Sequence, residues 1–147
     1  MINVSKYKNI VLDFDGVILD ANKERKQNMK CVLDGNLNQE LSNLTFDYFS
    51  KNPGISRNIL LGKFIKDELI LKKVLKQYYT LNLSTLHNCN LVKGVEEFII
   101  KFYKSKKIFV LTGADEEEVK NLVKKKKLNK YIFYLGGGPK SKIQHLK

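Results

Sequence analysis

Two aspartates one residue apart, Asp13 and Asp15, are the side chains in this sequence whose type and spacing most suggest chemistry. They follow a short apolar run, residues 10–12, with the length and composition of a strand buried on both faces. Open parallel sheets bind ligands at the carboxyl ends of their strands, so both carboxylates could share a site there. Close carboxylates repel, and a hard divalent cation such as Mg²⁺ relieves that repulsion. A strand that runs into an acidic turn explains the same residues equally well.

The elements that would position these aspartates follow from the remaining apolar runs. Residues 108–111 predict a second strand, which ends at Thr112 and Gly113, and residues 131–135 predict a third strand before a Gly-Gly-Gly-Pro turn. Acidic residues at 115–118 and lysines at 124–127 mark the two ends of a helix between these strands. The order strand–helix–strand–helix–strand implies an α/β fold with parallel strands. Thr112 would then lie beside Asp13, where its hydroxyl and the Gly113 amide suit a phosphoryl oxygen. Taken alone, a Thr-Gly pair after a strand is more typical of a simple turn.

The stretch between the first two predicted strands has the apolar spacing of helices. Apolar residues recur at helical spacing through residues 37–48, and Asn52-Pro53-Gly54 interrupts them. Ser56 is a candidate helix cap, and residues 59–79 predict two helices. We therefore predict an α/β core made of residues 1–18 and 92–147, with an all-helical insert over residues 19–91.

Charge and cysteine content limit the functional classes. The net charge of +12 suggests nucleic-acid binding, but residues 1–100 hold 14 Lys/Arg against 11 Asp/Glu, whereas residues 101–147 hold 13 against 4. Much of the excess is the lysine run at 124–127, which is typical of a solvated helix end. Cys31 and Cys89 are far apart in sequence and predict reduced thiols in a cytoplasmic protein. The sequence contains no apolar run long enough for a membrane span, and from its polar first residues we expect no signal peptide.

The segment Asp-Phe-Asp-Gly-Val-Ile-Leu-Asp at residues 13–20 resembles the first motif of the haloacid dehalogenase superfamily of phosphohydrolases. The resemblance implies a Rossmann-like core with a helical cap, as in subfamily I and phosphoglycolate-phosphatase-like members. It makes Asp13 the nucleophile and Asp15 the general acid/base, with Mg²⁺ bound at Asp13 and Asp15. Thr112 and Gly113 match the second motif, which binds phosphate.

The third motif of that family supplies a lysine beside the phosphate. Gly-Gly-Pro-Lys-Ser-Lys at residues 137–142 resembles one of its forms and selects Lys142, with Lys140 as the near alternative. Residues 52–57 resemble a Gly-Gly-Ile-Ser-Arg loop of the mobile cap in phosphatases of surface-polysaccharide and sugar-nucleotide pathways. This implies that Arg57 contacts substrate, although Pro53 and Ser50 depart from that pattern. A first-turn surface arginine is the alternative for Arg57.

The family's fourth motif, an acidic segment that completes the Mg²⁺ site, has no counterpart in this sequence. We therefore expect a truncated family member that turns over phosphomonoesters poorly. Its first strand would be a sheet edge, covered by a second copy or by another partner.

The expected function is an enzyme, a phosphatase that acts on a small phosphorylated metabolite, such as a sugar phosphate, through an aspartyl-phosphate. A sugar phosphomutase is an alternative within the family. A catalytically impaired protein that binds phosphorylated ligands or a protein partner is an alternative from another class. A nucleic-acid end phosphatase or binder is favoured by charge alone.

Overall fold

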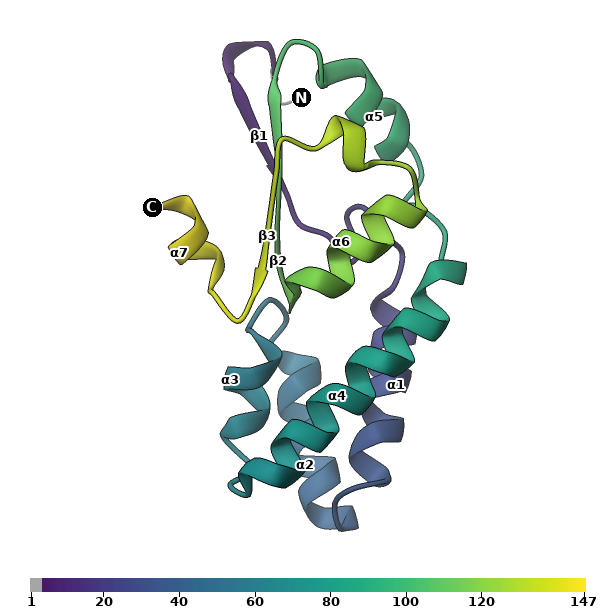
Figure 1. The fold of residues 1–147 in the computed structure, drawn as a ribbon, viewed down its shortest axis with the longest axis vertical. Helices are drawn as coiled ribbons and strands as arrows, with labels where there is room; N and C mark the ends of the chain where they lie inside the picture. The colour runs from purple at the N-terminus through teal and green to yellow at the C-terminus, as the bar shows by residue number, and fades with distance from the viewer. Residues whose placement is uncertain (1–3) are drawn as a thin grey trace.

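The computed structural model describes residues 4–147, which form a three-stranded parallel sheet with helices on both sides and a group of helices at one end (Figure 1). The strands are β1 (Asn9–Leu12), β2 (Lys107–Asp115) and β3 (Tyr134–Gly138), in the order β1-β2-β3. Both neighbouring pairs are parallel, which confirms the predicted α/β fold. In this order β1 is an edge strand, also as predicted.

Helices cover the two faces of the sheet unequally. On one side lie α5 (Val95–Phe102) and α6 (Glu116–Lys125), and on the other lies only the short α7 (Lys142–Leu146) (Figure 1). Asp115 caps α6, since its Oδ1 accepts a hydrogen bond from the Glu118 amide at 3.0 Å. Acids in the first turn and lysines in the last turn complement the helix dipole, so the predicted charge order of this helix is confirmed. Three short 3₁₀ turns complete this part of the chain: η1 (Val4–Lys6), η2 (Leu86–Asn88) and η3 (Asn129–Tyr131).

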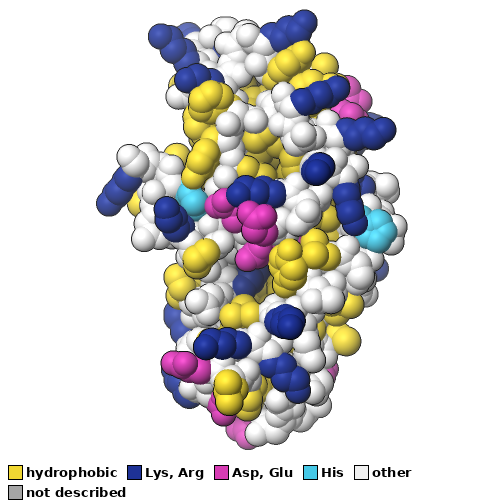
Figure 2. Space-filling view, in the orientation of Figure 1, with side chains coloured by type: hydrophobic (Ala, Val, Ile, Leu, Met, Phe, Trp, Pro, Cys, Tyr) yellow, Lys and Arg dark blue, Asp and Glu magenta, His cyan; other side chains and the backbone are white. Residues whose placement is uncertain are grey.

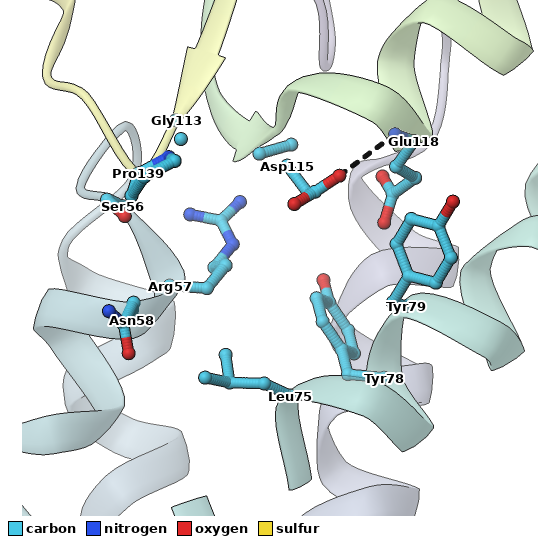
Figure 3. A pocket seen from close by; sticks show the side chains of 12 residues that line it. Ser56, Arg57, Asn58, Leu75, Tyr78, Tyr79, Gly113, Asp115, Glu118 and Pro139 are labelled. Atoms are coloured by element: carbon cyan, nitrogen blue, oxygen red, sulfur yellow. Dashed lines mark hydrogen bonds between the residues drawn. The ribbon is translucent and has the colours of Figure 1, made fainter. Parts of the chain in front are cut away.

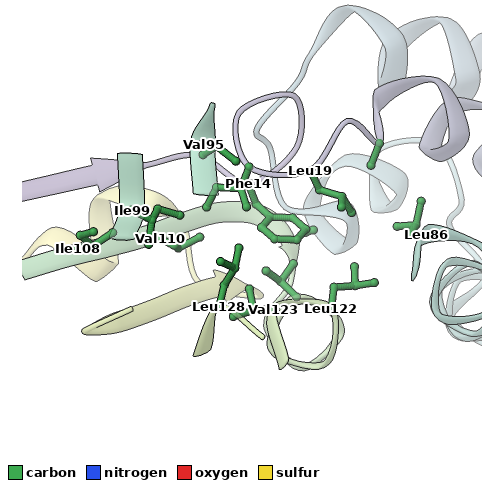
Figure 4. Close-up of a cluster of buried hydrophobic side chains, with 14 residues drawn as sticks. Phe14, Leu19, Leu86, Val95, Ile99, Ile108, Val110, Leu122, Val123 and Leu128 are labelled. Atoms are coloured by element: carbon green, nitrogen blue, oxygen red, sulfur yellow. The ribbon is translucent and has the colours of Figure 1, made fainter. Parts of the chain in front are cut away.

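One apolar cluster fills the space between the sheet and α5 and α6 (Figure 4). Phe14, which lies between the two aspartates, is 1% exposed and packs in this cluster. The cluster also includes fully buried side chains of β2, α5 and α6, namely Ile108, Val110, Ile99, Val119 and Leu122. Burial of Phe14 therefore anchors the loop that carries both aspartates.

Four helices form the insert between β1 and β2: α1 (Asn22–Asp34), α2 (Gln39–Lys51), α3 (Arg57–Gly62) and α4 (Glu68–Thr85). They enclose a second apolar cluster, which includes Met29, Leu33, Phe49, Leu60, Leu61 and Val74. The prediction of two helices after Ser56 is confirmed by α3 and α4. The predicted domain boundaries at residues 18 and 92 stay a prediction.

Three sequence expectations about the strands were wrong. The first strand is not buried on both faces: Val11 is 50% exposed because β1 lies at the sheet edge. The second strand continues past Thr112 to Asp115. The third strand is displaced to Tyr134–Gly138, and its glycines form strand rather than turn. A Cβ on Gly137 would lie 2.8 Å from the Glu116 Cα, so close packing against the start of α6 requires glycine there.

One face of the molecule shows how charged side chains are distributed on it (Figure 2). Figure 2 shows Lys and Arg side chains spread over the face in view, with acidic side chains among them. Within residues 4–147, no helix combines the length and the hydrophobicity that crossing a membrane requires.

Candidate active site

The carboxyl ends of β1 and β2 bring the predicted catalytic and phosphate-binding residues together. Leu12 is paired with Val110 in the parallel register, so Asp13 and Thr112 follow at the same edge of the sheet. Both side chains line a small pocket of about 80 Å³ together with Asp15. The expected proximity of these residues is thus a feature of the structure, although their roles stay predictions.

Asp13 is held from two sides. Its Oδ1 accepts a hydrogen bond from the amide of Phe14 at 2.8 Å, and its Oδ2 lies 2.6 Å from Nζ of Lys142. The Asp13 and Lys142 side chains are 42% and 32% exposed, so the pair remains open to solvent and to a ligand. This contact joins residues that are 129 positions apart in the chain.

Helix α7 places Lys142 at the site. Ser141 begins the helix with a capping box, in which its hydroxyl accepts from the Gln144 amide and the Gln144 side chain accepts from the Ser141 amide. Lys142 is therefore in the first turn, directed at Asp13. Of the two lysines that the sequence left open, Lys142 is the one paired with Asp13.

Thr112 and Gly113 form the floor of the pocket. Thr112 is 1% exposed, and its Oγ1 accepts a hydrogen bond from the Ala114 amide at 3.1 Å. Accepting that bond leaves the hydroxyl proton free to donate. Gly113 packs against the backbone of Gly54 in the loop before α3, with no space for a side chain. The insert therefore touches the sheet edge directly beside the pocket.

Asp15 has a partner that sequence reasoning missed. Its Oδ1 lies 2.6 Å from Nε of Arg25 on α1, and Nη1 of Arg25 lies 2.6 Å from Oε1 of Glu118 on α6. Burial opposes the charge on Arg25, but the two carboxylates more than offset it, so the pKa of Arg25 is raised above its ordinary value. Burial raises the pKa of Glu118. A signal existed, because Arg25 falls on the same face of α1 as Met29 and Val32.

Arg57, predicted to contact substrate, lies at the boundary of two pockets. Its Nη1 donates to the carbonyl of Ile55 at 2.8 Å, and its guanidinium lies 5.0 Å from the ring centre of Phe49. It lines the small pocket near Asp13 and also a larger neighbouring one. Arg57 is the first residue of α3, in keeping with the first-turn alternative, so both that alternative and substrate contact stay predictions.

The larger pocket, of about 240 Å³, lies between the insert and the ends of β2 and β3 (Figure 3). The Arg57 guanidinium and the Tyr78 hydroxyl point into it, and the carboxylate of Asp115 lies across from them (Figure 3). Within the described residues, Nε of Arg57 and the hydroxyl of Tyr78 are buried without a hydrogen-bond partner. The pocket shares Gly113 and Arg57 with the small one, so the two form adjoining compartments.

The donor set suits a hard cation in part. Asp13 offers a half-exposed carboxylate, and the main-chain carbonyl of Asp15 is the second oxygen that the resemblance assigns to Mg²⁺. Among residues 4–147, no three His, Cys, Asp or Glu side chains gather as a metal-binding group. Mg²⁺ commonly keeps several waters and binds one or two carboxylates plus substrate phosphate, and such a site needs no larger protein cluster.

Several solved structures share this fold. A predicted phosphatase from Clostridium acetobutylicum aligns with a TM-score of 0.71 at 18% identity, over 95% of this chain and 68% of its own. A predicted phosphoglycolate phosphatase from Haemophilus somnus aligns at 0.67 and 18% identity, over 95% and 67% of the two chains. CbbY from Rhodobacter sphaeroides, solved in complex with phosphate, aligns at 0.67 and 11% identity, over 89% and 63%. At these identities the similarity establishes the fold.

A search of curated protein sequences found no significant match. A family model described as haloacid dehalogenase-like hydrolase matches residues 10–141, which run from β1 through the first aspartate pair to the residue before Lys142. The chain belongs to the haloacid dehalogenase-like hydrolases.

Proposed function

We propose that this chain is a phosphatase that hydrolyses a small phosphorylated metabolite through an aspartyl-phosphate on Asp13. The observation that carries this proposal is the 2.6 Å contact between Lys142 Nζ and Asp13 Oδ2 at the pocket that Thr112 and Gly113 line. A carboxylate nucleophile and a phosphate are both anionic, so a fixed cation beside them lowers the cost of bringing them together. The threonine hydroxyl and the glycine amide add donors for the phosphoryl oxygens.

In the first step, a carboxylate oxygen of Asp13 attacks phosphorus. A bond forms between that oxygen and phosphorus as the bond between phosphorus and the ester oxygen breaks. Protonated Asp15 gives its proton to the departing oxygen, which leaves as an alcohol. The products are the phosphorylated Asp13 and the carboxylate of Asp15.

In the second step, the Asp15 carboxylate takes a proton from a water molecule as that water attacks phosphorus. The bond between phosphorus and Asp13 breaks, which releases inorganic phosphate and restores the Asp13 carboxylate. Asp15 is protonated again, so the cycle closes without any other reactant.

Mg²⁺ is part of this proposal. The Asp13 carboxylate and the main-chain carbonyl of Asp15 would hold it, and the ion would supply positive charge between carboxylate and phosphate.

The two adjoining pockets would bind different parts of the substrate. The small pocket, of about 80 Å³, suits the phosphoryl group, and the larger one, of about 240 Å³, suits the remaining part of a small metabolite. Arg57 lies on both and would contact the substrate where its two parts meet.

The proposal is tested with a panel of phosphomonoesters in the presence and absence of Mg²⁺. We expect slow phosphate release from wild-type protein with Mg²⁺, because the acidic fourth motif has no counterpart in this sequence. We expect none from Asp13→Asn, which keeps the shape of the side chain but removes the nucleophile. Mass spectrometry should find one phosphoryl group on the Asp13 peptide after rapid acid quenching. Turnover by Asp13→Asn at the wild-type rate would refute the mechanism.

Two lysine variants provide a matched comparison within the same segment. Lys142→Gln removes the charge beside Asp13 and should lower kcat/KM by about 10²-fold or more, the scale of a lost electrostatic contact. Lys140→Gln changes an exposed lysine of the same segment that is not paired with Asp13 and should leave kcat/KM unchanged. Ligand binding without turnover would favour a non-catalytic protein, and phosphoryl return to a second position of a sugar would favour a mutase.

A further inference from the structure

Arg25 lies within a buried group of polar side chains that joins the helical insert to the sheet. The residue is 2% exposed, and its guanidinium is 2.6 Å from both Asp15 and Glu118. Glu118 is in turn held by Asn82, whose Nδ2 donates to Oε2 at 2.9 Å. We call these four residues, Asp15, Arg25, Asn82 and Glu118, the Arg25 network.

The Arg25 network draws on both parts of the fold. Asp15 belongs to the loop after β1, and Glu118 belongs to α6 beside the sheet. Arg25 and Asn82 come from α1 and α4 of the insert. The insert therefore supplies the guanidinium that contacts the Asp15 carboxylate. Glu118 of α6 contacts this guanidinium, and Asn82 of α4 donates a hydrogen bond to Glu118.

Burial of the Arg25 guanidinium is energetically costly unless its charge is compensated. A buried guanidinium needs carboxylate partners, and removal of Arg25 would leave the carboxylates of Asp15 and Glu118 without a cation between them. Both contacts of Arg25 are ion pairs with an N–O distance of 2.6 Å. The network thereby fixes the place of Oδ1 of Asp15.

The second oxygen of Asp15 is in a different situation. Within the described residues, Oδ2 accepts no hydrogen bond, and the Asp15 side chain lines the small pocket beside Asp13. One carboxylate oxygen is thus engaged by the insert, and the other is available at the pocket.

We propose that Arg25 is a positioning residue, which holds one oxygen of Asp15 so that the other can exchange a proton with the leaving group. This inference rests on the proposed phosphatase function and adds that the insert organises the acid/base. Two other roles are distinguishable: Arg25 could contact the phosphoryl group itself, or it could serve only to hold the insert against the core.

The test uses two phosphomonoesters that differ in their need for an acid. An alkyl phosphate needs protonation of its leaving oxygen, whereas 2,4-dinitrophenyl phosphate releases a stable anion without it. Arg25→Gln should lower kcat/KM by about 10²-fold for the alkyl ester and by less than about 3-fold for the aryl ester. We use kcat/KM because it reports the first phosphoryl transfer. Arg25→Lys, which keeps a cation, should recover part of the loss.

Control variants separate positioning from loss of structure. Val32→Ala creates a cavity on the buried face of α1, on the same helix, without touching Asp15. It should affect both esters equally. If Arg25→Gln does not fold, the paired variant Arg25→Met with Glu118→Met removes the two most deeply buried charges and leaves only the Asp15 carboxylate, whose side chain is 13% exposed at the pocket. It should show the same preference for the aryl ester.

A second readout does not depend on activity. Hydrogen exchange of the amides in residues 14–21 should rise by about 10-fold or more in Arg25→Gln and remain at the wild-type level in Val32→Ala. Equal losses for both esters, or unchanged exchange in this segment, would overturn the proposal. If wild-type protein hydrolyses no phosphomonoester, the proposed function fails, and the exchange result alone decides whether Arg25 holds the Asp15 segment.

Discussion

At the scale of single residues, the candidate site depends on side chains that the backbone brings together from distant parts of the sequence. Asp13 meets Lys142 across 129 positions, and Asp15 meets Glu118 only through Arg25. Glycines make some of these approaches possible, because a side chain at Gly113 would collide with the backbone of Gly54.

The contact between Gly113 and Gly54 predicts an asymmetry between two glycine substitutions. Gly113→Ala should lower the free energy of unfolding by about 1–3 kcal/mol, since its Cβ meets backbone that cannot rotate away. Gly62→Ala is the control: its Cβ would meet only a Leu71 methyl at 3.7 Å, so stability should change little or rise. Urea unfolding of both variants checks this. Equal stabilities of the two variants would show that the loop before α3 moves away from the added methyl group at little energetic cost.

The buried carboxylate of Glu118 predicts a pH dependence of stability. Burial raises the pKa of Glu118 in the folded state, so the folded state retains this proton at a pH where the unfolded chain has lost it. Its contribution to stability is greatest below the unfolded pKa and declines as pH rises through the folded pKa. Glu118→Gln lacks this decline, so the variant should gain stability relative to wild type as pH rises above about 4.3, the ordinary pKa of glutamate. A pH-independent difference in urea unfolding would contradict this.

At the scale of elements, helix ends that look alike in sequence differ in the structure. Ser56 occupies the N-cap position of α3, as predicted, but its side chain makes no capping hydrogen bond. Asp67 caps α4 and accepts from the amides of Leu69 and Ile70. Residue type alone therefore predicted which residue occupies the N-cap position, but not whether its side chain accepts a hydrogen bond from the helix amides.

These two caps give a paired prediction. Asp67→Ala should lower the free energy of unfolding by about 1 kcal/mol, because two amides in the first turn of α4 lose their acceptor. Ser56→Ala removes no such acceptor and should cost less. Thermal unfolding of both variants under one condition provides the comparison. A larger loss for Ser56→Ala would mean that its hydroxyl supports the loop in another way.

Sequence reasoning succeeded where periodicity and parallel geometry decide the outcome. Helical spacing predicted α3 and α4, and the rule that parallel strands end at a common edge placed Thr112 near Asp13. It failed for β3, because three glycines look like a turn until the close approach of Glu116 explains them. It also missed Arg25, since charged residues are expected at the surface unless a distant partner such as Glu118 is known.

At the scale of the whole molecule, the sheet has two edge strands, β1 and β3, and one thinly covered face. β1 pairs only with β2, and Val11 and Tyr7 are 50% and 59% exposed. On the face opposite α5 and α6, α7 is the one helix of residues 4–147 that packs against the sheet (Figure 1). An unpaired edge strand with exposed apolar side chains is a template for pairing with another chain.

We therefore expect the protein to self-associate reversibly through β1, with the edge strands of two copies hydrogen-bonded to each other. Sedimentation velocity over a concentration series should show a dimer whose share rises with concentration. Val11→Lys puts a charge on the exposed side of the strand and should weaken the dimer, because edge lysines oppose strand pairing. Leu69→Lys is the matched control, since Leu69 is 78% exposed on α4, in the insert. Equal weakening by both variants, or a wild-type protein that stays monomeric throughout, would show that a second copy does not cover this edge.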